Sequence, residues 1–133
     1  MAIIDFFDRG WRINPTGAAY IQEDRRYSFD EVGELSCRIA NGLLAHRLPK
    51  QTKGAVWATN DVADWTCTLG LWRANMCWIP SGARTPAEEN QYVLDAFDCE
   101  VLFFQKDFAP VIAAMQPRLP KIRLWICIDD ELP

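Results

Sequence analysis

Hydrophobic and polar positions divide the chain into an N-terminal region with two helices and a longer region of alternating strands and helices. Apolar residues at helical spacing predict a first helix over residues 3–11, stopped before Pro15, because the residue that precedes a proline disfavours helical backbone. Residues 18–22 predict a strand, and residues 26–27 predict its hairpin partner. The first helix is expected to turn four side chains inward: Ile3, Phe6, Phe7 and Trp11.

The second helix has the clearest start signal in the chain. Ser28 is followed three positions later by Glu31, the capping-box pattern in which each side chain accepts a hydrogen bond from the other residue's backbone N–H. The helix is expected to end near His46 and Arg47, because cationic side chains suit the negative end of the helix dipole. Its predicted inward stripe consists of Phe29, Val32, Leu35, Ile39, Ala40, Leu43 and Leu44.

From Gly54 onward, short apolar runs alternate with helical patterns. The predicted strands are residues 55–58, 76–79, 101–104 and 122–128. The predicted helices are residues 61–74, a helix that opens at Thr85, and residues 108–115. Strands that are joined by crossover helices form parallel sheets. The sequence therefore predicts an α/β fold with a parallel βαβαβαβ core, preceded by the N-terminal helix, the hairpin and the amphipathic helix.

The helix that opens at Thr85 carries its own start signals. Thr85 is the expected cap, Pro86 the first helical residue, and Glu88 completes a capping box. We expect this helix to bury Tyr92, Val93, Ala96 and Phe97.

Composition narrows the classes of function. The chain has 133 residues, half of them hydrophobic, which is the size and apolar content of one domain. Its net charge of −4 argues against a nucleic-acid partner, which needs a basic surface. No stretch approaches the ~20 apolar residues of a membrane span, and the start lacks the basic region of a signal peptide. Five cysteines without a CxxC pair favour a reducing compartment, so we expect a cytoplasmic protein.

Candidate chemistry is sparse. The sequence contains no glycine-rich phosphate loop, and His46 is its only histidine, so neither a catalytic residue nor a metal ligand is predicted. Open α/β sheets bind ligands at the loops that follow their strands. The expected loops are residues 59–61, 81–85 and 105–107. Among them, Arg84 is the one cofactor-binding candidate, because an arginine can clamp a phosphate or a carboxylate; the alternative is an ion pair between Arg84 and a nearby acid such as Glu88.

Two groups of motifs follow the order and spacing of a known family. Residues 26–32 (RYSFDEV) resemble the early Thr/Ser-Tyr/Phe-x-Glu-Leu motif of the adenylate-forming superfamily. Residues 56–80 resemble its core strand and Lys-Ala-Gly-x-x-x-x-Pro motif, and residues 84–94 resemble its Arg-x-Thr-x-x-Glu helix. Two features depart from the family pattern: Asn75 stands where the family usually has glycine, and residues 51–55 replace its common Lys-Gly-Asp. Among the members of this superfamily, fatty-acyl-CoA ligases have the motifs to which those of this chain are most similar.

This resemblance implies that residues 1–133 are the N-terminal part of the large domain of an acyl-CoA ligase, ending before the phosphate loop. In that family, a carboxylate attacks the α-phosphate of ATP in the presence of Mg²⁺ and forms an acyl-adenylate. CoA then displaces AMP from this intermediate. The resemblance implies a fatty acid as the substrate. The phosphate loop and the catalytic lysine lie downstream in the family. The chain alone is therefore expected to bind none of these cofactors and to be inactive.

A second interpretation is a free-standing α/β binding or dimerisation module without catalysis. Such a module would have to close its own hydrophobic faces, for example as a homodimer. A clean folded monomer would favour a self-sufficient module, whereas dimerisation or aggregation would fit a part of a larger domain.

Overall fold

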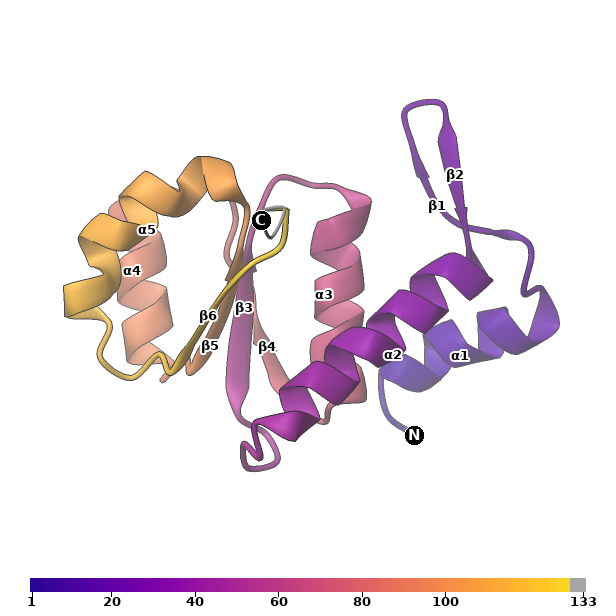
Figure 1. The fold of residues 1–133 in the computed structure, drawn as a ribbon, viewed down its shortest axis with the longest axis horizontal. Helices are drawn as coiled ribbons and strands as arrows, with labels where there is room; N and C mark the ends of the chain where they lie inside the picture. Colours follow the sequence, from indigo (N-terminus) through magenta and orange to yellow (C-terminus); the bar gives the residue numbers. More distant parts are fainter. Residues whose placement is uncertain (130–133) are drawn as a thin grey trace.

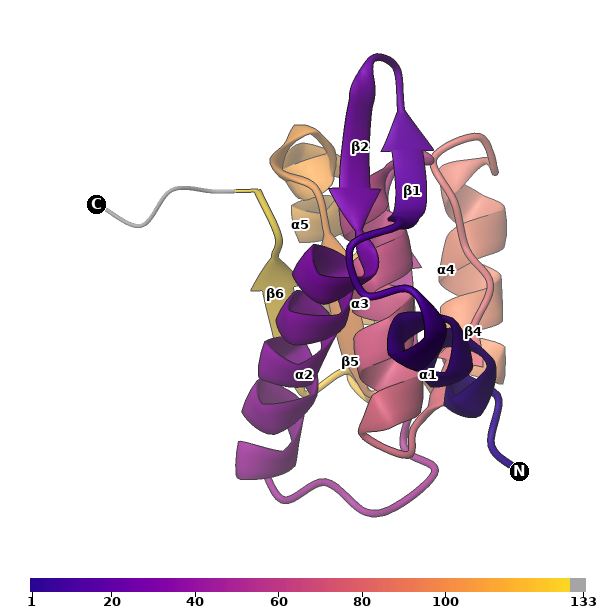
Figure 2. The same cartoon turned by 90° about the vertical axis from the view of Figure 1, so that its right-hand side faces the viewer.

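A computed structural model describes residues 1–129 of the chain (Figures 1 and 2). Its helices are α1 (Ile4–Ile13), α2 (Phe29–Ala45), α3 (Val62–Arg73), α4 (Ala87–Ala96) and α5 (Ala109–Met115), with the short 3-10 turns η1 (Lys106–Phe108) and η2 (Gln116–Arg118) on either side of α5. Its strands are β1 (Ala18–Gln22), β2 (Arg25–Ser28), β3 (Lys53–Trp57), β4 (Cys77–Ile79), β5 (Val101–Phe104) and β6 (Leu124–Cys127). The predicted α/β class and the predicted order of elements are confirmed.

Four of the strands form one parallel sheet in the order β4-β3-β5-β6, while β1 and β2 form a separate antiparallel hairpin. The chain leaves β3 to add β4 on one side, and then crosses to add β5 on the other side. The direction of winding therefore changes at β3. In open α/β sheets this change opens a crevice at the carboxyl ends of the strands, where ligands bind.

Helices cover both faces of the sheet. In Figure 1, α2 and α3 lie on one side of it and α4 and α5 on the other. Successive residues of a strand point to opposite faces. Val56 accordingly packs in the cluster that contains Leu43 and Leu71, whereas Trp57 packs in the cluster that contains Leu94. The central strands are thus buried on both sides, as their continuous apolar runs predict.

The N-terminal elements form a third cluster beside α3 (Figure 2). Ile4 and Phe7 of α1 pack with Val32 of α2 and Leu69 of α3. The ring of Phe7 lies 5.2 Å from that of Phe29, centroid to centroid. These contacts bind the N-terminal helices to the helical layer of the sheet.

Several side chains that the sequence places inside are exposed. They are Ile3, Phe6, Leu35, Leu44, Tyr92, Ala96 and Phe97. Helical spacing alone defines a broad apolar stripe, but the position of the neighbouring element decides which part of the stripe is covered. On α4, for example, Tyr92 is 73 % exposed while Asn90 and Leu94, four residues apart, are buried. The inward assignments for these seven residues are wrong for that reason.

The predicted start of α4 also needs correction. Pro86 occupies the N-cap position in an extended conformation, the helix begins at Ala87, and no side chain caps it. Thr85 therefore lies outside the helix and cannot act as its cap. At the start of α2, one half of the predicted capping box is present, since Ser28 Oγ accepts a hydrogen bond of 3.1 Å from the Glu31 N–H. At the start of α3, the side chain of Asp61 is the cap, which was not predicted.

Asn75 marks the turn from α3 to β4. Its φ is 63°, in the left-handed region that glycine adopts without steric cost. Asparagine is among the residues other than glycine that enter this region most readily. The turn can therefore hold asparagine at this position, where the superfamily that the sequence resembles usually has glycine.

Candidate functional site

Two of the predicted loops meet at the carboxyl ends of the central strands. The side chain of Gln105, after β5, accepts a hydrogen bond of 2.9 Å from the Thr59 N–H, after β3. The same side chain donates to Asp61 Oδ2 at 2.7 Å. One glutamine thus joins the loop after β5 to the start of α3. Such a meeting follows from the parallel sheet, because its strands have their carboxyl ends at one edge.

A hollow of about 420 Å³ lies between the loops that follow β3 and β4. We call it the strand-end hollow, and it is lined by residues 58–60 and 82–85. The loop after β4 is anchored to α4. The side chain of Asn90 is buried, and its Nδ2 donates a hydrogen bond of 2.9 Å to the Gly82 carbonyl. Arg84 is exposed at this hollow. Within residues 1–129 it forms no ion pair or hydrogen bond, so the alternative pairing with Glu88 is absent there.

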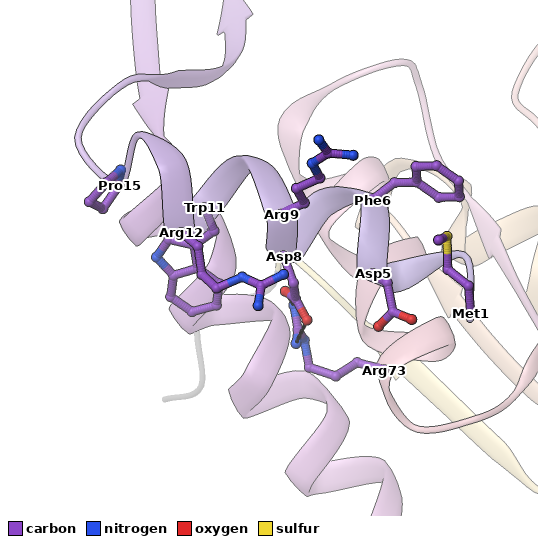
Figure 3. Close-up of a pocket in the computed structure, with 9 residues that line it drawn as sticks. All are labelled: Met1, Asp5, Phe6, Asp8, Arg9, Trp11, Arg12, Pro15 and Arg73. Carbon is purple, nitrogen blue, oxygen red and sulfur yellow. Dashed lines mark hydrogen bonds and ion pairs between the residues drawn. The ribbon is translucent and has the colours of Figure 1, made fainter.

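A larger hollow of about 890 Å³ lies beside α1 and the end of α3 (Figure 3). Its central contact is a bidentate ion pair in which the Arg73 guanidinium donates to the two carboxylate oxygens of Asp8 at 2.8 and 3.1 Å. Arg73 Nε also donates to Ser36 Oγ at 3.1 Å. Burial lowers the pKa of Arg73, but the hydrogen bond and the charge of Asp8 outweigh it and raise that pKa above its usual value. This contact between α1, α2 and α3 was missed from the sequence because its partners are 65 positions apart.

Asp8→Asn is expected to lower the free energy of unfolding by about 2 kcal/mol, less than the loss for a fully buried pair. The reason is that Arg73, whose side chain is only 17 % exposed, would keep its charge without a partner. Urea unfolding followed by tryptophan fluorescence measures the change. Asp98→Asn is the control, because Asp98 pairs with Lys121 on the open surface. Equal losses for the two variants would contradict a structural role for the Arg73–Asp8 pair.

Asp64, in the first turn of α3, carries a perturbed carboxyl group. Burial disfavours its charged form, and the nearby charge of Asp61 adds to that effect; together they raise the pKa of Asp64 from 3.8 to about 6. Because the folded-state pKa lies above the unfolded value, folding is favoured when Asp64 is protonated. That contribution is lost as the pH rises from about 4 through 6.

Asp64→Asn is therefore expected to stabilise the chain at pH 7.5 relative to the parent, by about 1 kcal/mol once solvent screening of the half-exposed group is allowed for. At pH 4 the gain should vanish, because the parent carboxyl is then largely neutral as well. Thermal unfolding at the two pH values measures the difference. Asp24→Asn at the exposed tip of the hairpin serves as the matched control. An equal gain from Asp64→Asn at both pH values would refute the assignment.

Two of the five cysteines, Cys67 and Cys99, are buried and are not activated as nucleophiles. Burial raises the pKa of the Cys67 thiol to about 12 and that of the Cys99 thiol to about 12. Both side chains are buried in apolar clusters. Protonated thiols in such surroundings act as small hydrophobic groups.

Comparison with known proteins assigns the family. A family model described as AMP-binding enzyme matches residues 7–133. The chain belongs to the AMP-binding enzyme family. The predicted membership of the adenylate-forming superfamily is thereby confirmed.

Several curated relatives of this AMP-binding enzyme chain are acyl-CoA ligases. It is 28 % identical over 130 residues to a medium-chain acyl-CoA ligase of Mycobacterium avium, covering 88 % of this chain and 24 % of that protein. It is 27 % identical over 131 residues to a 4-hydroxybenzoate–CoA/benzoate–CoA ligase of Rhodopseudomonas palustris, covering 97 % of this chain and 24 % of that protein. The chain thus spans about a quarter of the length of these relatives.

Solved structures share the fold. A Mycobacterium tuberculosis fatty acyl-CoA synthetase superposes with a TM-score of 0.85 at 22 % identity, covering 96 % of this chain and 26 % of that one. The N-terminal subdomain of Klebsiella oxytoca NpsA superposes with a TM-score of 0.72 at 22 % identity, covering 79 % of this chain and 28 % of that one. Residues 1–129 therefore share the fold of a part of these structures, which in NpsA belongs to the N-terminal subdomain. Within the described residues, no helix is long and apolar enough to cross a membrane.

Proposed function

We propose that residues 1–133 supply the N-terminal part of the large domain of an acyl-CoA ligase. The observation that carries this proposal is the family match over residues 7–133, combined with ligase relatives of which the chain spans about a quarter. In the complete enzyme, a carboxylate, of the fatty class, would attack the α-phosphate of ATP to give acyl-adenylate and pyrophosphate. The CoA thiol would then displace AMP and form the thioester.

The residues of this chain do not by themselves fit ATP and Mg²⁺. The sequence has no glycine-rich loop that could cradle phosphates. Residues 1–129 contain no group of three or more His, Cys, Asp or Glu side chains that could hold a metal ion. The proposed role of the chain is therefore that of a scaffold, in which the parallel sheet and its helices form one wall of the large domain. Alone, the chain is proposed to be inactive.

Arg84 is proposed to contact an anionic group, a phosphate or a carboxylate, in the complete enzyme. Three features support this role: the side chain is exposed, it lines the strand-end hollow, and it has no partner within residues 1–129. The hollow also lies at the carboxyl ends of the parallel strands, the edge at which α/β sheets bind ligands. A guanidinium group offers paired donors that match either anion.

The proposed function is tested on the product of the longest reading frame that contains these residues. Carboxylate-dependent ATP–pyrophosphate exchange, followed by thioester formation with CoA, is the expected result. Arg84→Gln should raise the KM of the anionic ligand that it contacts more than it lowers kcat, whereas Glu88→Gln on the next helix should change neither. A folded longer product without carboxylate-dependent exchange, over fatty and aromatic acids, would contradict the proposal.

The two edge strands of the sheet favour the proposal that the chain is part of a larger domain. Within residues 1–129, β4 and β6 each have a partner strand on one side only. Unpaired edges invite pairing with further strands. We propose that further chain pairs with them in the complete enzyme, and that the isolated chain associates with itself through the same edges. Light scattering over a concentration series measures this association, and a monomer at all concentrations would favour a self-sufficient module.

A further inference from the structure

A further hollow on the surface is lined by both aromatic rings and carboxylates. It lies between the hairpin, α3 and β4 and has a volume of about 670 Å³. We call it the aromatic hollow. The side chains that matter for its chemistry are Tyr20, Asp61, Asp64, Trp65, Trp72 and Trp78.

The rings stand in two pairs along α3. Tyr20 of the hairpin lies 5.5 Å from Trp65, between ring centroids. Trp72 lies 5.9 Å from Trp78 of β4 in an edge-to-face arrangement. Asp64 and Trp72 are two steps of four residues apart, so they lie on one face of the helix, separated by about 12 Å of helix rise. The Tyr20–Trp65 pair therefore lies at the end of the hollow that holds Asp64, and the Trp72–Trp78 pair lies at the other end.

The charge of the hollow is negative and uncompensated. Both carboxylate oxygens of Asp61 accept hydrogen bonds, one from the Asp64 N–H at 2.9 Å and one from Gln105 Nε2 at 2.7 Å. The Asp64 carboxylate accepts none within residues 1–129, and no lysine, arginine or histidine is among the described residues that line the hollow. Burial and the neighbouring Asp61 raise the pKa of Asp64 to about 6. At pH 7 and above the hollow thus holds an ionised carboxylate whose free energy a cation would lower.

We propose that the aromatic hollow binds an organic cation with a substituted ammonium group. The rings provide negative faces for a weakly hydrated cation, and Asp64 supplies the countercharge. A bare metal ion would gain nothing from the indoles, because metal ions in proteins take oxygen, nitrogen or sulfur ligands. A neutral apolar ligand would gain nothing from the carboxylates. This ligand class is also opposite in charge to the carboxylic acid of the proposed ligase reaction, so the two proposals succeed or fail separately.

The test uses the purified 133-residue chain at pH 7.5 with choline as the probe. Its matched control ligand is 3,3-dimethyl-1-butanol, which has the same shape but no charge. Isothermal titration and tryptophan fluorescence should show saturable choline binding that is about tenfold tighter than binding of the alcohol. Asp64→Asn should remove most of that preference, while Asp24→Asn on the hairpin tip should leave it unchanged. Tyr20→Leu, which removes the hairpin ring that lies 5.5 Å from Trp65 at the Asp64 end of the hollow, should weaken choline at least as much as it weakens the alcohol.

Four results would overturn the proposal. The first is no saturable binding of choline, and the second is equal binding of choline and the alcohol. The third is a choline affinity that neither Asp64→Asn nor Tyr20→Leu changes while circular dichroism shows both variants folded. Displacement of choline by Ca²⁺ at equal concentration would also contradict it, because that result would indicate an acidic metal site rather than an aromatic one.

Discussion

Replacing Gly70 with valine is expected to lower the free energy of unfolding by about 3 kcal/mol, at the upper end of the usual cost of overpacking. Gly70 lies in α3 where that helix crosses α2. A β-carbon at this position would collide with Ile39 Cγ2 and would lie 2.9 Å from Ile39 Cβ, with the Ser36 carbonyl oxygen also within van der Waals range. The Cβ of Ile39 belongs to a branched side chain close to its own helix backbone, so it cannot move aside. Chemical denaturation of Gly70→Val measures the loss.

Gly42 provides the matched control for Gly70. It lies in α2, and a β-carbon there would meet nothing within 4 Å. Gly42→Ala should therefore raise the free energy of unfolding by about 0.5–1 kcal/mol through helix propensity alone. Opposite signs for the two variants would establish that close helix contact, rather than helix propensity, requires Gly70. A stabilising Gly70→Val would contradict the packing of α2 against α3.

Leu43→Ala is expected to cost about 3 kcal/mol, within the range for fully buried leucines. Leu43, on α2, is 2 % exposed and packs in the cluster with Val56 and Leu71. Leu35→Ala on the same helix should cost less than about 1 kcal/mol, because Leu35 is 47 % exposed. The same urea titrations report both values. Similar losses at the two positions would mean that α2 presents a different face to the sheet.

These two leucines also show how far sequence reasoning reaches. Both belong to the apolar stripe that predicted α2, and that stripe, together with the Ser28 cap, correctly predicted the helix. Periodicity cannot rank positions within the stripe, because burial is decided by which side α3 and the sheet approach. The same limit explains why Tyr92 was expected inside α4 and is exposed. At the start of α4, Pro86 occupies the N-cap position that was expected for Thr85. The spacing of Thr85, Pro86 and Glu88 fits a helix that begins at either residue, so the sequence alone does not decide where α4 begins.

The candidate sites, too, could be predicted only in part from the sequence. The meeting of the loops after β3 and β5 could be predicted, because parallel strands present their carboxyl ends at one edge. The Arg73–Asp8 pair and the aromatic hollow could not, because their members come from elements far apart in sequence and only the packed fold brings them together. A lone arginine at the end of an apolar helix was the available signal for the ion pair. Nothing in the local sequence of Trp65 or Trp78 indicated that they would line one hollow.

Carboxylate-dependent ATP–pyrophosphate exchange by the purified 133-residue chain tests the central claim most directly. That claim is that the chain carries the beginning of the adenylate-forming fold but not its chemistry. With Mg²⁺, ATP and a series of fatty and aromatic acids, the folded chain is expected to give exchange no greater than buffer alone. Exchange above that background, dependent on the acid and lost on unfolding, would contradict it.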